Sequence, residues 1–266
     1  MTRDTPVVAS IDWLAEHRDD PGVRVVDVRD GWEYDAIGHV PGAVSIPFET
    51  FRTGDGGDVG MLPGAERFGA LLSEVGVAPD DTLVAYDDEH GVFAARFLVT
   101  AMVYGHEDVR LLDGDFTAWS RREPTTTDAP DVSPTGYAAS IPGDHPLIDA
   151  DGVLDAIGEA DTVLIDTRTT EEFEAGHIEG AVNFDWRDLV DPDSRGLKPR
   201  EDLVAILDSH GVTTGKRVVL YCNTARRISH TYLVLRHLGY EDVAFFEGSL
   251  TEWRERDLPL VTGPAE

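Results

Sequence analysis

Residues 23–49 read VRVVDVRDGWEYDAIGHVPGAVSIPFE, and residues 162–186 read TVLIDTRTTEEFEAGHIEGAVNFDW. Each segment contains a short β-branched run, an Asp-x-Arg triplet and a Gly-His turn that ends in Gly-Ala. A bounded apolar run of this length is typical of a buried strand in a parallel sheet. We interpret the two segments as one structural unit that occurs twice.

Two further blocks repeat in the same order along the chain. Residues 71–91 resemble residues 206–226, and residues 105–124 resemble residues 239–259. A period this long indicates a duplicated domain, because solenoid repeats span only 20–50 residues. The chain is therefore predicted to contain two homologous domains.

The domain boundaries are predicted from composition. Residues 125–146 are rich in Thr, Pro, Ser and Gly and have no helical period, which is typical of a linker. We expect an N-terminal domain over 1–124 and a C-terminal domain over 147–266.

Strand-like and helix-like patterns alternate within the second copy. Such alternation predicts an α/β fold, with one parallel sheet per domain and helices on both faces. The expected strands are 163–166, 218–222 and 243–248, and the expected helices are 155–160, 200–211 and 228–239.

The composition is strongly acidic. The 266 residues include 22 Lys and Arg against 51 Asp and Glu, a formal net charge of −29. A field of this sign repels nucleic acid and anionic membranes, so we expect neither as a partner. Only two of the basic residues are lysines, Lys198 and Lys216, and Asp outnumbers Glu. This composition resembles that of halophilic proteins.

Cys222 is the single cysteine of the chain. One thiol excludes an intramolecular disulfide and is too few for a structural zinc or iron–sulfur site. No stretch approaches the roughly 18 apolar residues of a membrane span, and no targeting segment is evident. We expect a cytoplasmic protein that uses no cofactor and no metal.

Cys222 stands where a ligand of an α/β protein is expected. It ends an apolar strand and precedes a short loop and a helix, and in open α/β sheets ligands collect beyond the carboxyl ends of strands. Helix N-termini and nearby cations favour the thiolate, which is the nucleophilic form of cysteine. The alternative is a small buried residue that closes a strand. We predict that Cys222 is a catalytic nucleophile.

The loop after Cys222 supplies candidate substrate-binding groups. Arg226 and Arg227 carry guanidinium groups that bind sulfonate or phosphate oxygens, although both could instead pair with nearby carboxylates. The backbone N–H groups of Asn223, Thr224 and Ala225 are expected to face the same anion.

The loop length separates two chemistries. A cysteine phosphatase needs five residues between its cysteine and its arginine, which would place the arginine at position 228, where this chain has isoleucine. Arg227 comes one residue earlier. A shorter loop forms a smaller cradle, which suits a single sulfur atom on Cys222 better than a phosphoryl group. Phosphoester chemistry remains a disfavoured alternative.

The sequence resembles the tandem-domain rhodaneses, the thiosulfate and 3-mercaptopyruvate sulfurtransferases, over residues 7–262. The resemblance rests on DVR and DTR with GHVPGA and GHIEGA, on CNTARR (222–227), and on the elements that end in Trp119 and Trp253. CNTARR is close to the C-Q-T-x-x-R loop of some bacterial thiosulfate sulfurtransferases. It differs from the C-G-S-G-V-T loop typical of mercaptopyruvate sulfurtransferases.

The resemblance implies that Cys222 takes the outer sulfur of thiosulfate, holds it as a persulfide and passes it to cyanide or a thiol. A mercaptopyruvate sulfurtransferase and a slow persulfide carrier for a partner protein are the alternatives. No general base is required, and we expect His230 to face solvent or to pack.

The sequence departs from the family at one position of the second copy. Many members have a substrate-binding arginine after the second Asp-x-Arg triplet, where this chain has Glu172. Anion binding is then expected to fall to Arg226, to Arg227 or to a residue that the sequence does not identify. The aligned region of the first copy, Phe48-Glu49, has no aromatic residue equivalent to Trp186. Trp186 could line the active-site cleft or pack in the core.

The Asp-x-Arg triplets are expected to be structural. Arg29 and Arg168 occupy the same place in both copies, so we predict pairing with Asp27 and Asp166.

The first copy lacks the thiol. Asp87 aligns with Cys222, and the loop 87–91 carries three carboxylates. Such a loop repels an anionic substrate, so we expect an inactive domain. A metal site on Asp87, Asp88 and Glu89 is a weak alternative, because adjacent carboxylates usually form a solvated face.

The net charge leads to a prediction about salt. Self-repulsion opposes the compact state at low ionic strength, and 1 M salt cuts the Debye length from about 10 Å to about 3 Å. We expect the melting temperature to rise as KCl increases from about 0.1 to about 3 M. A melting temperature that stays flat or falls would contradict the halophilic interpretation.

Overall fold

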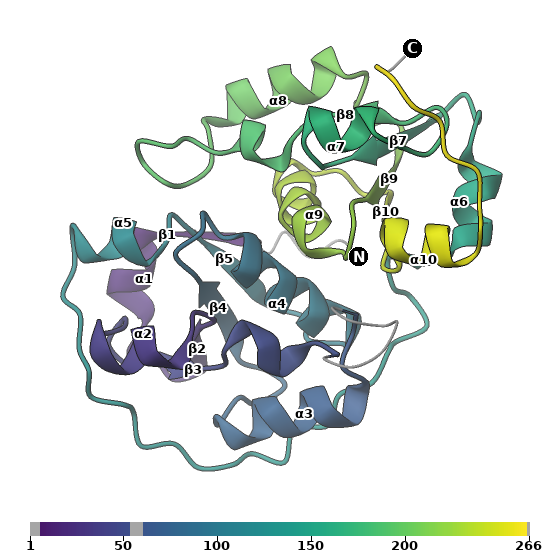
Figure 1. The fold of residues 1–266 in the computed structure, drawn as a ribbon. Coiled ribbons are helices and arrows are strands. Elements are labelled where there is room, and N and C mark those ends of the chain that lie inside the picture. Colours follow the sequence, from purple (N-terminus) through teal and green to yellow (C-terminus); the bar gives the residue numbers. More distant parts are fainter. Residues whose placement is uncertain (1–5, 54–60, 265–266) are drawn as a thin grey trace. The chain divides into compact units, whose positions relative to one another are not determined.

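The computed structural model describes residues 6–53 and 61–264 and divides into two compact units (Figure 1). Unit 1 consists of residues 1–145 together with 192–197, and unit 2 consists of residues 146–191 and 198–266. Across the described ranges, every helix is too short or too polar to cross a membrane.

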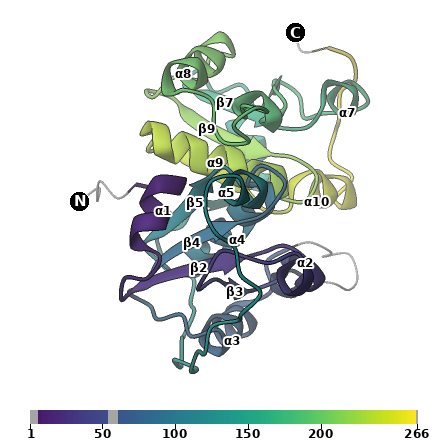
Figure 2. The same ribbon diagram turned by 90° about the vertical axis from the view of Figure 1, so that its left-hand side faces the viewer.

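Unit 1 contains a five-stranded parallel sheet in the order β1-β5-β4-β2-β3. Figure 2 shows β5, β4, β2 and β3 following one another across this sheet. The strands are β1 (Val8–Ser10), β2 (Val23–Asp27), β3 (Val44–Ser45), β4 (Thr82–Tyr86) and β5 (Val109–Asp113).

Helices cover both faces of the unit 1 sheet. Residues of the first and the last helix pack in one hydrophobic cluster with Val84 and Tyr86, while the long helix after β4 packs against β4 and β5. The helices are α1 (Ile11–His17), α2 (Gly31–Ala36), η1 (Phe48–Phe51), α3 (Ala65–Glu74), α4 (Val92–Val103) and α5 (Phe116–Ser120).

Unit 2 repeats the same topology. Its parallel sheet has the order β6-β10-β9-β7-β8, which is the order of unit 1 shifted by five strands. The strands are β6 (Leu147–Ile148), β7 (Thr162–Asp166), β8 (Val182–Asn183), β9 (Arg217–Tyr221) and β10 (Val243–Phe246). The predicted fold class, two α/β domains with one parallel sheet each, is confirmed.

The helices of unit 2 also lie on both faces of its sheet. One cluster buries Phe173 and Trp253 against Val219 and Tyr221, and the helix after β9 lies on the opposite face. The helices are α6 (Ala150–Ala156), α7 (Thr170–Glu174), η3 (Trp186–Leu189), α8 (Arg200–Ser209), α9 (Arg226–Leu238) and α10 (Ser249–Glu255).

The helix expected at 155–160 lies earlier in the chain, as α6. The Asp149 side chain accepts a hydrogen bond from the Gly152 N–H and so starts the helix at Ala150. Ile157 has extended backbone angles and ends it. The prediction from the apolar spacing of 155–160 was therefore wrong about the position of the helix, because the N-cap residue Asp149 decides where it begins.

The Asp-x-Arg pairs are structural, as predicted. The Arg168 guanidinium donates to both carboxylate oxygens of Asp166 at 2.6–3.0 Å and to the Gly176 carbonyl oxygen at 2.8 Å. Arg29 makes the same contacts with Asp27 and the Gly38 carbonyl. A buried ion pair thus ties the end of β2 in unit 1, and of β7 in unit 2, to the Gly-His turn.

Residues 125–145 belong to unit 1, although 125–146 was predicted to be a linker. Thr126 and His39 exchange two backbone hydrogen bonds of 2.8 and 3.0 Å, and Tyr137 is buried with its hydroxyl 2.9 Å from the His106 Nδ1. The polar composition of this segment is explained by an irregular chain that packs along the first unit.

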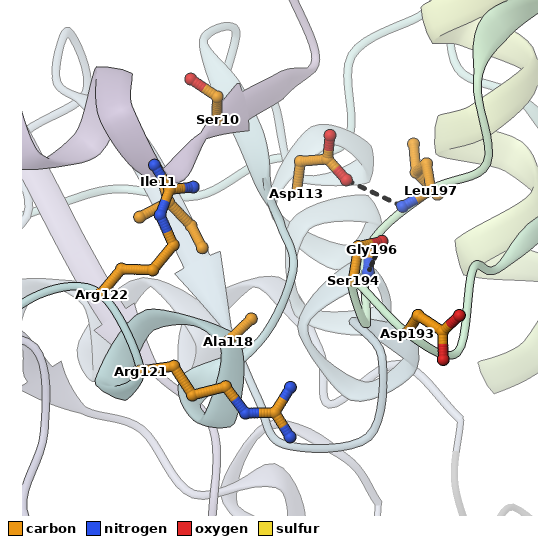
Figure 3. Close-up of a pocket in the computed structure, with 10 residues that line it drawn as sticks. All are labelled: Ser10, Ile11, Asp113, Ala118, Arg121, Arg122, Asp193, Ser194, Gly196 and Leu197. Atoms are coloured by element: carbon orange, nitrogen blue, oxygen red, sulfur yellow. Dashed lines mark hydrogen bonds between the residues drawn. The ribbon is translucent and has the colours of Figure 1, made fainter.

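Residues 192–197 join unit 1 although they lie within the second repeat. Arg195 pairs with the buried Asp115 at 2.6 Å, and the Leu197 N–H donates to Asp113 at 2.8 Å. A pocket of about 360 Å³ lies between this segment and residues at the ends of β1, β5 and α5. Figure 3 shows the residues that line it. Arg121 and Arg122 line it, and the single cysteine of the chain does not.

Candidate active site

Cys222 directly follows β9, the central strand of unit 2, and its side chain is 2% exposed. The turn after β10 fixes its backbone on both sides. The Cys222 N–H donates to the Ser249 Oγ at 3.1 Å, and the Cys222 carbonyl oxygen accepts from the Leu250 N–H at 3.1 Å. The thiol is therefore held at the carboxyl end of the sheet, where the sequence predicted it.

The N-terminus of α9 lies just beyond the cysteine. Ala225, which is fully buried and has a φ of 61°, turns the chain into α9, and no side chain caps the first turn of this 13-residue helix. The N–H groups of a first helical turn have no partner within the helix, and the helix dipole makes this end favourable for an anion. The predicted residues Asn223, Thr224 and Ala225 form the connecting loop.

Ser249 supports the loop from the turn that follows the neighbouring strand, β10. This residue was not identified from the sequence. Its hydroxyl donates to the Phe246 carbonyl oxygen at 2.9 Å while it accepts from Cys222. Its φ of 47° lies in the left-handed region, which costs a non-glycine residue roughly 1–3 kcal/mol. Thr251 adds a second contact, donating from its hydroxyl to the Asn223 carbonyl oxygen at 2.9 Å.

Glu172 accepts hydrogen bonds from two residues of the loop. Arg227 Nη1 donates to one carboxylate oxygen of Glu172 at 2.5 Å, and Asn223 Nδ2 donates to the other at 2.9 Å. The same carboxylate caps α7 by accepting from the Thr169 N–H at 3.2 Å. Burial raises the pKa of Glu172, but the bonds from Arg227, Thr169 and Asn223 outweigh it and bring this pKa to about 2.

Arg227 pairs with a carboxylate, which is the alternative that the sequence left open for the two arginines. The charge of Arg227 is compensated by Glu172. Glu172 stands where the resembled family often has a substrate-binding arginine. Arg226 is the first residue of α9 and is half-buried. The net charge that the loop offers an anion is thus smaller than the sequence CNTARR indicates.

Trp186 and His230 pack together. The two rings make an edge-to-face contact with centroids 5.0 Å apart, and the His230 side chain is fully buried in α9. Trp186 is 9% exposed. The structure thus places Trp186 in core packing, and it places His230 in packing rather than in solvent.

Asp87 occupies the matching place in unit 1. It follows β4, is 1% exposed, and its carboxylate accepts four backbone hydrogen bonds of 2.7–2.9 Å. Burial raises the pKa of the Asp87 carboxyl, and these N–H groups oppose the rise. The donors are the N–H groups of Glu89, Gly91, Phe93 and Ala94.

In unit 1 the turn after the central strand is therefore an anion cradle. Its N–H groups, from the loop and the first turn of α4, converge on a carboxylate that the chain supplies itself. Asp88 is also engaged, by Thr117 and Arg195. Among the described residues, no three His, Cys, Asp or Glu side chains group in a way that could hold a metal ion.

Comparisons with known proteins agree with the repeat. Residues 10–122 and 149–256 each match the model of the Rhodanese-like domain. The chain is 35% identical over 270 residues to the sulfur carrier protein TtuD of Thermus thermophilus, covering 93% of each chain. It is 34% identical over 242 residues to the thiosulfate sulfurtransferase of Azotobacter vinelandii, covering 88% of each.

A solved structure has the same fold. The crystal structure of SseA from Escherichia coli, a 3-mercaptopyruvate sulfotransferase, matches with a TM-score of 0.82 and 29% identity. The match covers 92% of this chain and 99% of that chain.

The low pKa of Glu172 predicts a pH-dependent contribution to stability. A carboxyl group whose pKa falls from 4.5 to about 2 on folding stabilises the folded state above pH 4.5, and this contribution is lost as the pH falls towards 2. The difference in unfolding free energy between wild type and Glu172→Gln should therefore shrink over this range. Urea unfolding from pH 7 to pH 2 measures it.

Glu171→Gln is the matched control, because Glu171 is an exposed neighbour on the same helix. Glu171 takes no part in the contacts with Arg227 and Asn223, so the pH trend of Glu172→Gln should be clearly larger than that of this control. Equal trends for the two variants would contradict the pairing of Glu172 with Arg227.

Removing the Asp87 carboxylate should destabilise unit 1. Asp87→Ala removes the acceptor of four N–H groups, those of Gly91 and Ala94 in buried hydrogen bonds, and each buried N–H group left unsatisfied costs about 1–3 kcal/mol. We expect a loss of at least about 3 kcal/mol, measured by hydrogen exchange of the α4 amides. Asp88→Ala, which leaves this cradle intact, is the control, and wild-type protection in Asp87→Ala would contradict the cradle.

Proposed function

This chain belongs to the rhodanese family, and on that premise we propose that it is a sulfurtransferase that moves a sulfane sulfur from thiosulfate to cyanide or a thiol through a persulfide on Cys222. The observation that carries the proposal is the single cysteine at the carboxyl end of β9, beside the uncapped N-terminus of α9. A relative that is 34% identical over most of the chain is named thiosulfate sulfurtransferase.

The reaction has two displacement steps. The Cys222 thiolate attacks the outer sulfur of thiosulfate, a new S–S bond forms, and sulfite leaves with the electron pair of the broken bond. Cyanide then attacks the outer sulfur of the persulfide, which releases thiocyanate and returns the thiolate. Electrons balance without an external oxidant, and the enzyme alternates between two covalent forms.

The backbone around Cys222 supports this chemistry. Negative charge is present on the thiolate and on the persulfide, and N–H groups at a helix N-terminus stabilise such charge without a general base. The Asp87 turn of unit 1 supports this role, because the same turn there gathers four N–H groups on one anion. His230 is buried against Trp186 and is not needed as a base.

A persulfide carrier that delivers sulfur to a partner protein is the second candidate. Two observations favour it: the 35% identity to a sulfur carrier protein, and the pairing of Glu172 with Arg227, which weakens the attraction for a free dianion. A 3-mercaptopyruvate donor is the third candidate, by likeness to SseA. The rate of sulfur release to small acceptors separates the enzyme from the carrier.

The partners, the cellular location and the salt adaptation of the protein are predicted from its sequence. We propose a small-molecule donor and acceptor, with no nucleic acid and no membrane as partner, for a cytoplasmic protein adapted to salt. The formal charge of −29 supports the exclusion of polyanions.

The proposal is tested by mass spectrometry of the intact protein after incubation with thiosulfate. Wild type should gain the mass of one sulfur atom, and added cyanide should remove it and release thiocyanate through many turnovers. Cys222→Ser should gain no mass and make no thiocyanate, because an alcohol cannot form a persulfide. Its melting temperature should stay close to that of wild type, since serine is nearly isosteric with cysteine.

Three results distinguish the candidates. Sulfur transfer by Cys222→Ser would refute the persulfide mechanism outright. A sulfur that loads but leaves only slowly would favour the carrier. Faster turnover with 3-mercaptopyruvate than with thiosulfate would change the donor and leave the role of Cys222 intact.

A further inference from the structure

Thr167 stands beside Cys222 at the end of the neighbouring strand. The register of β7 and β9 pairs Asp166 with Tyr221, so the next residue of each strand is Thr167 and Cys222. The pairing continues past the strand ends, since the Thr167 N–H donates to the Tyr221 carbonyl oxygen at 3.2 Å. Paired residues of adjacent strands lie about 4.8 Å apart.

The two side chains point to the same face of the sheet. Tyr221 and Asp166 share one face, because the Tyr221 hydroxyl is hydrogen-bonded to the Asp166 carboxylate. Side chains alternate along extended chain, which puts Thr167 and Cys222 together on the opposite face. This is the face on which α9 packs.

The backbone around Thr167 is fixed. Asn183 Nδ2 donates to the Asp166 carbonyl oxygen at 3.0 Å and to the Arg168 carbonyl oxygen at 2.9 Å, one on each side of Thr167. The Thr167 carbonyl oxygen accepts from the Trp186 N–H at 3.4 Å. The position of the hydroxyl therefore does not depend on a bond of its own.

The Thr167 hydroxyl is fully buried and has no hydrogen-bond partner among the described residues. Leaving a buried hydroxyl unsatisfied is unfavourable, so its presence calls for an explanation. Valine has nearly the same shape and would fill the same space without this cost.

The first repeat has that valine. Val28 aligns with Thr167, is 1% exposed, and donates its N–H to Tyr86 just as Thr167 does to Tyr221. Its neighbour on the adjacent strand is Asp87, which carries no thiol. The hydroxyl is thus present in the repeat that has a cysteine and absent from the repeat that has none.

We propose that the Thr167 hydroxyl donates a hydrogen bond to the outer sulfur of the persulfide on Cys222, and so recognises the sulfur-loaded state. The inference rests on the proposed function. In the unloaded protein the Thr167 hydroxyl has no hydrogen-bond partner among the described residues, the Cys222 sulfur included, whereas a charged outer sulfur adds an acceptor beyond it. Loading then satisfies a buried donor, which lengthens the life of the persulfide.

The test compares Thr167→Val, Thr167→Ser and wild type with and without thiosulfate treatment. Thr167→Val should leave the unloaded melting temperature unchanged or higher, because it removes an unpartnered hydroxyl. Its persulfide, followed by intact mass, should be lost to a fixed cyanide concentration about tenfold faster, since a hydrogen bond to a charged group of about 1.4 kcal/mol corresponds to a factor of ten. Thr167→Ser keeps the hydroxyl and should restore the wild-type rate.

Thr231→Val is the matched control. Thr231 is also fully buried in unit 2, and its hydroxyl likewise has no partner among the described residues. It lies within α9 and not at a strand end. This variant should change the unloaded melting temperature in the same direction as Thr167→Val and leave the persulfide lifetime unaltered.

The outcomes keep the inference apart from the proposed function. If wild type forms no persulfide, the proposed function fails. If wild type loads sulfur and Thr167→Val holds it as long as wild type does, only the role of Thr167 is overturned. A clear loss of stability in unloaded Thr167→Val would also overturn it, because the hydroxyl would then have a partner in the resting protein.

Discussion

Backbone N–H groups that converge beyond the central strand of unit 1 require an electron-rich partner, and the turn at this strand end depends on it. In unit 1 the partner is the Asp87 carboxylate, which takes four hydrogen bonds and closes the turn on itself. In unit 2 the corresponding residue is Cys222, which has a single sulfur atom where Asp87 has a carboxylate. The two units thus differ at this strand end: unit 1 carries a carboxylate that satisfies its own turn, and unit 2 carries a thiol.

The sequence was sufficient for features that depend on local or repeated patterns. The duplication, the fold class, the Asp-x-Arg ion pairs and the place of Cys222 all follow from short segments that can be compared between the copies. Helix α6 was misplaced because a capping aspartate, Asp149, outweighed the apolar spacing. The contacts of Ser249 and Glu172 with the loop could not be predicted from local sequence patterns, because they join residues that are 27 and 51 positions apart.

One signal was nevertheless present for Ser249. Gly114 directly follows β5 and Gly248 comes two residues after β10, and a polar residue follows each: Asp115 in one repeat and Ser249 in the other. Both reach back to the turn of the central strand, Ser249 through Cys222 and Asp115 through His90. Comparing such positions between copies, and not only the loop that holds the thiol, identifies the supporting residues.

The most direct test of the central claim is a crystal structure of the protein after incubation with thiosulfate. The account predicts one additional sulfur atom bonded to the Cys222 Sγ, within hydrogen-bond distance of the N–H groups at the start of α9. An unmodified thiol in protein whose mass shows a bound sulfur, or an added sulfur turned away from those N–H groups, would contradict it.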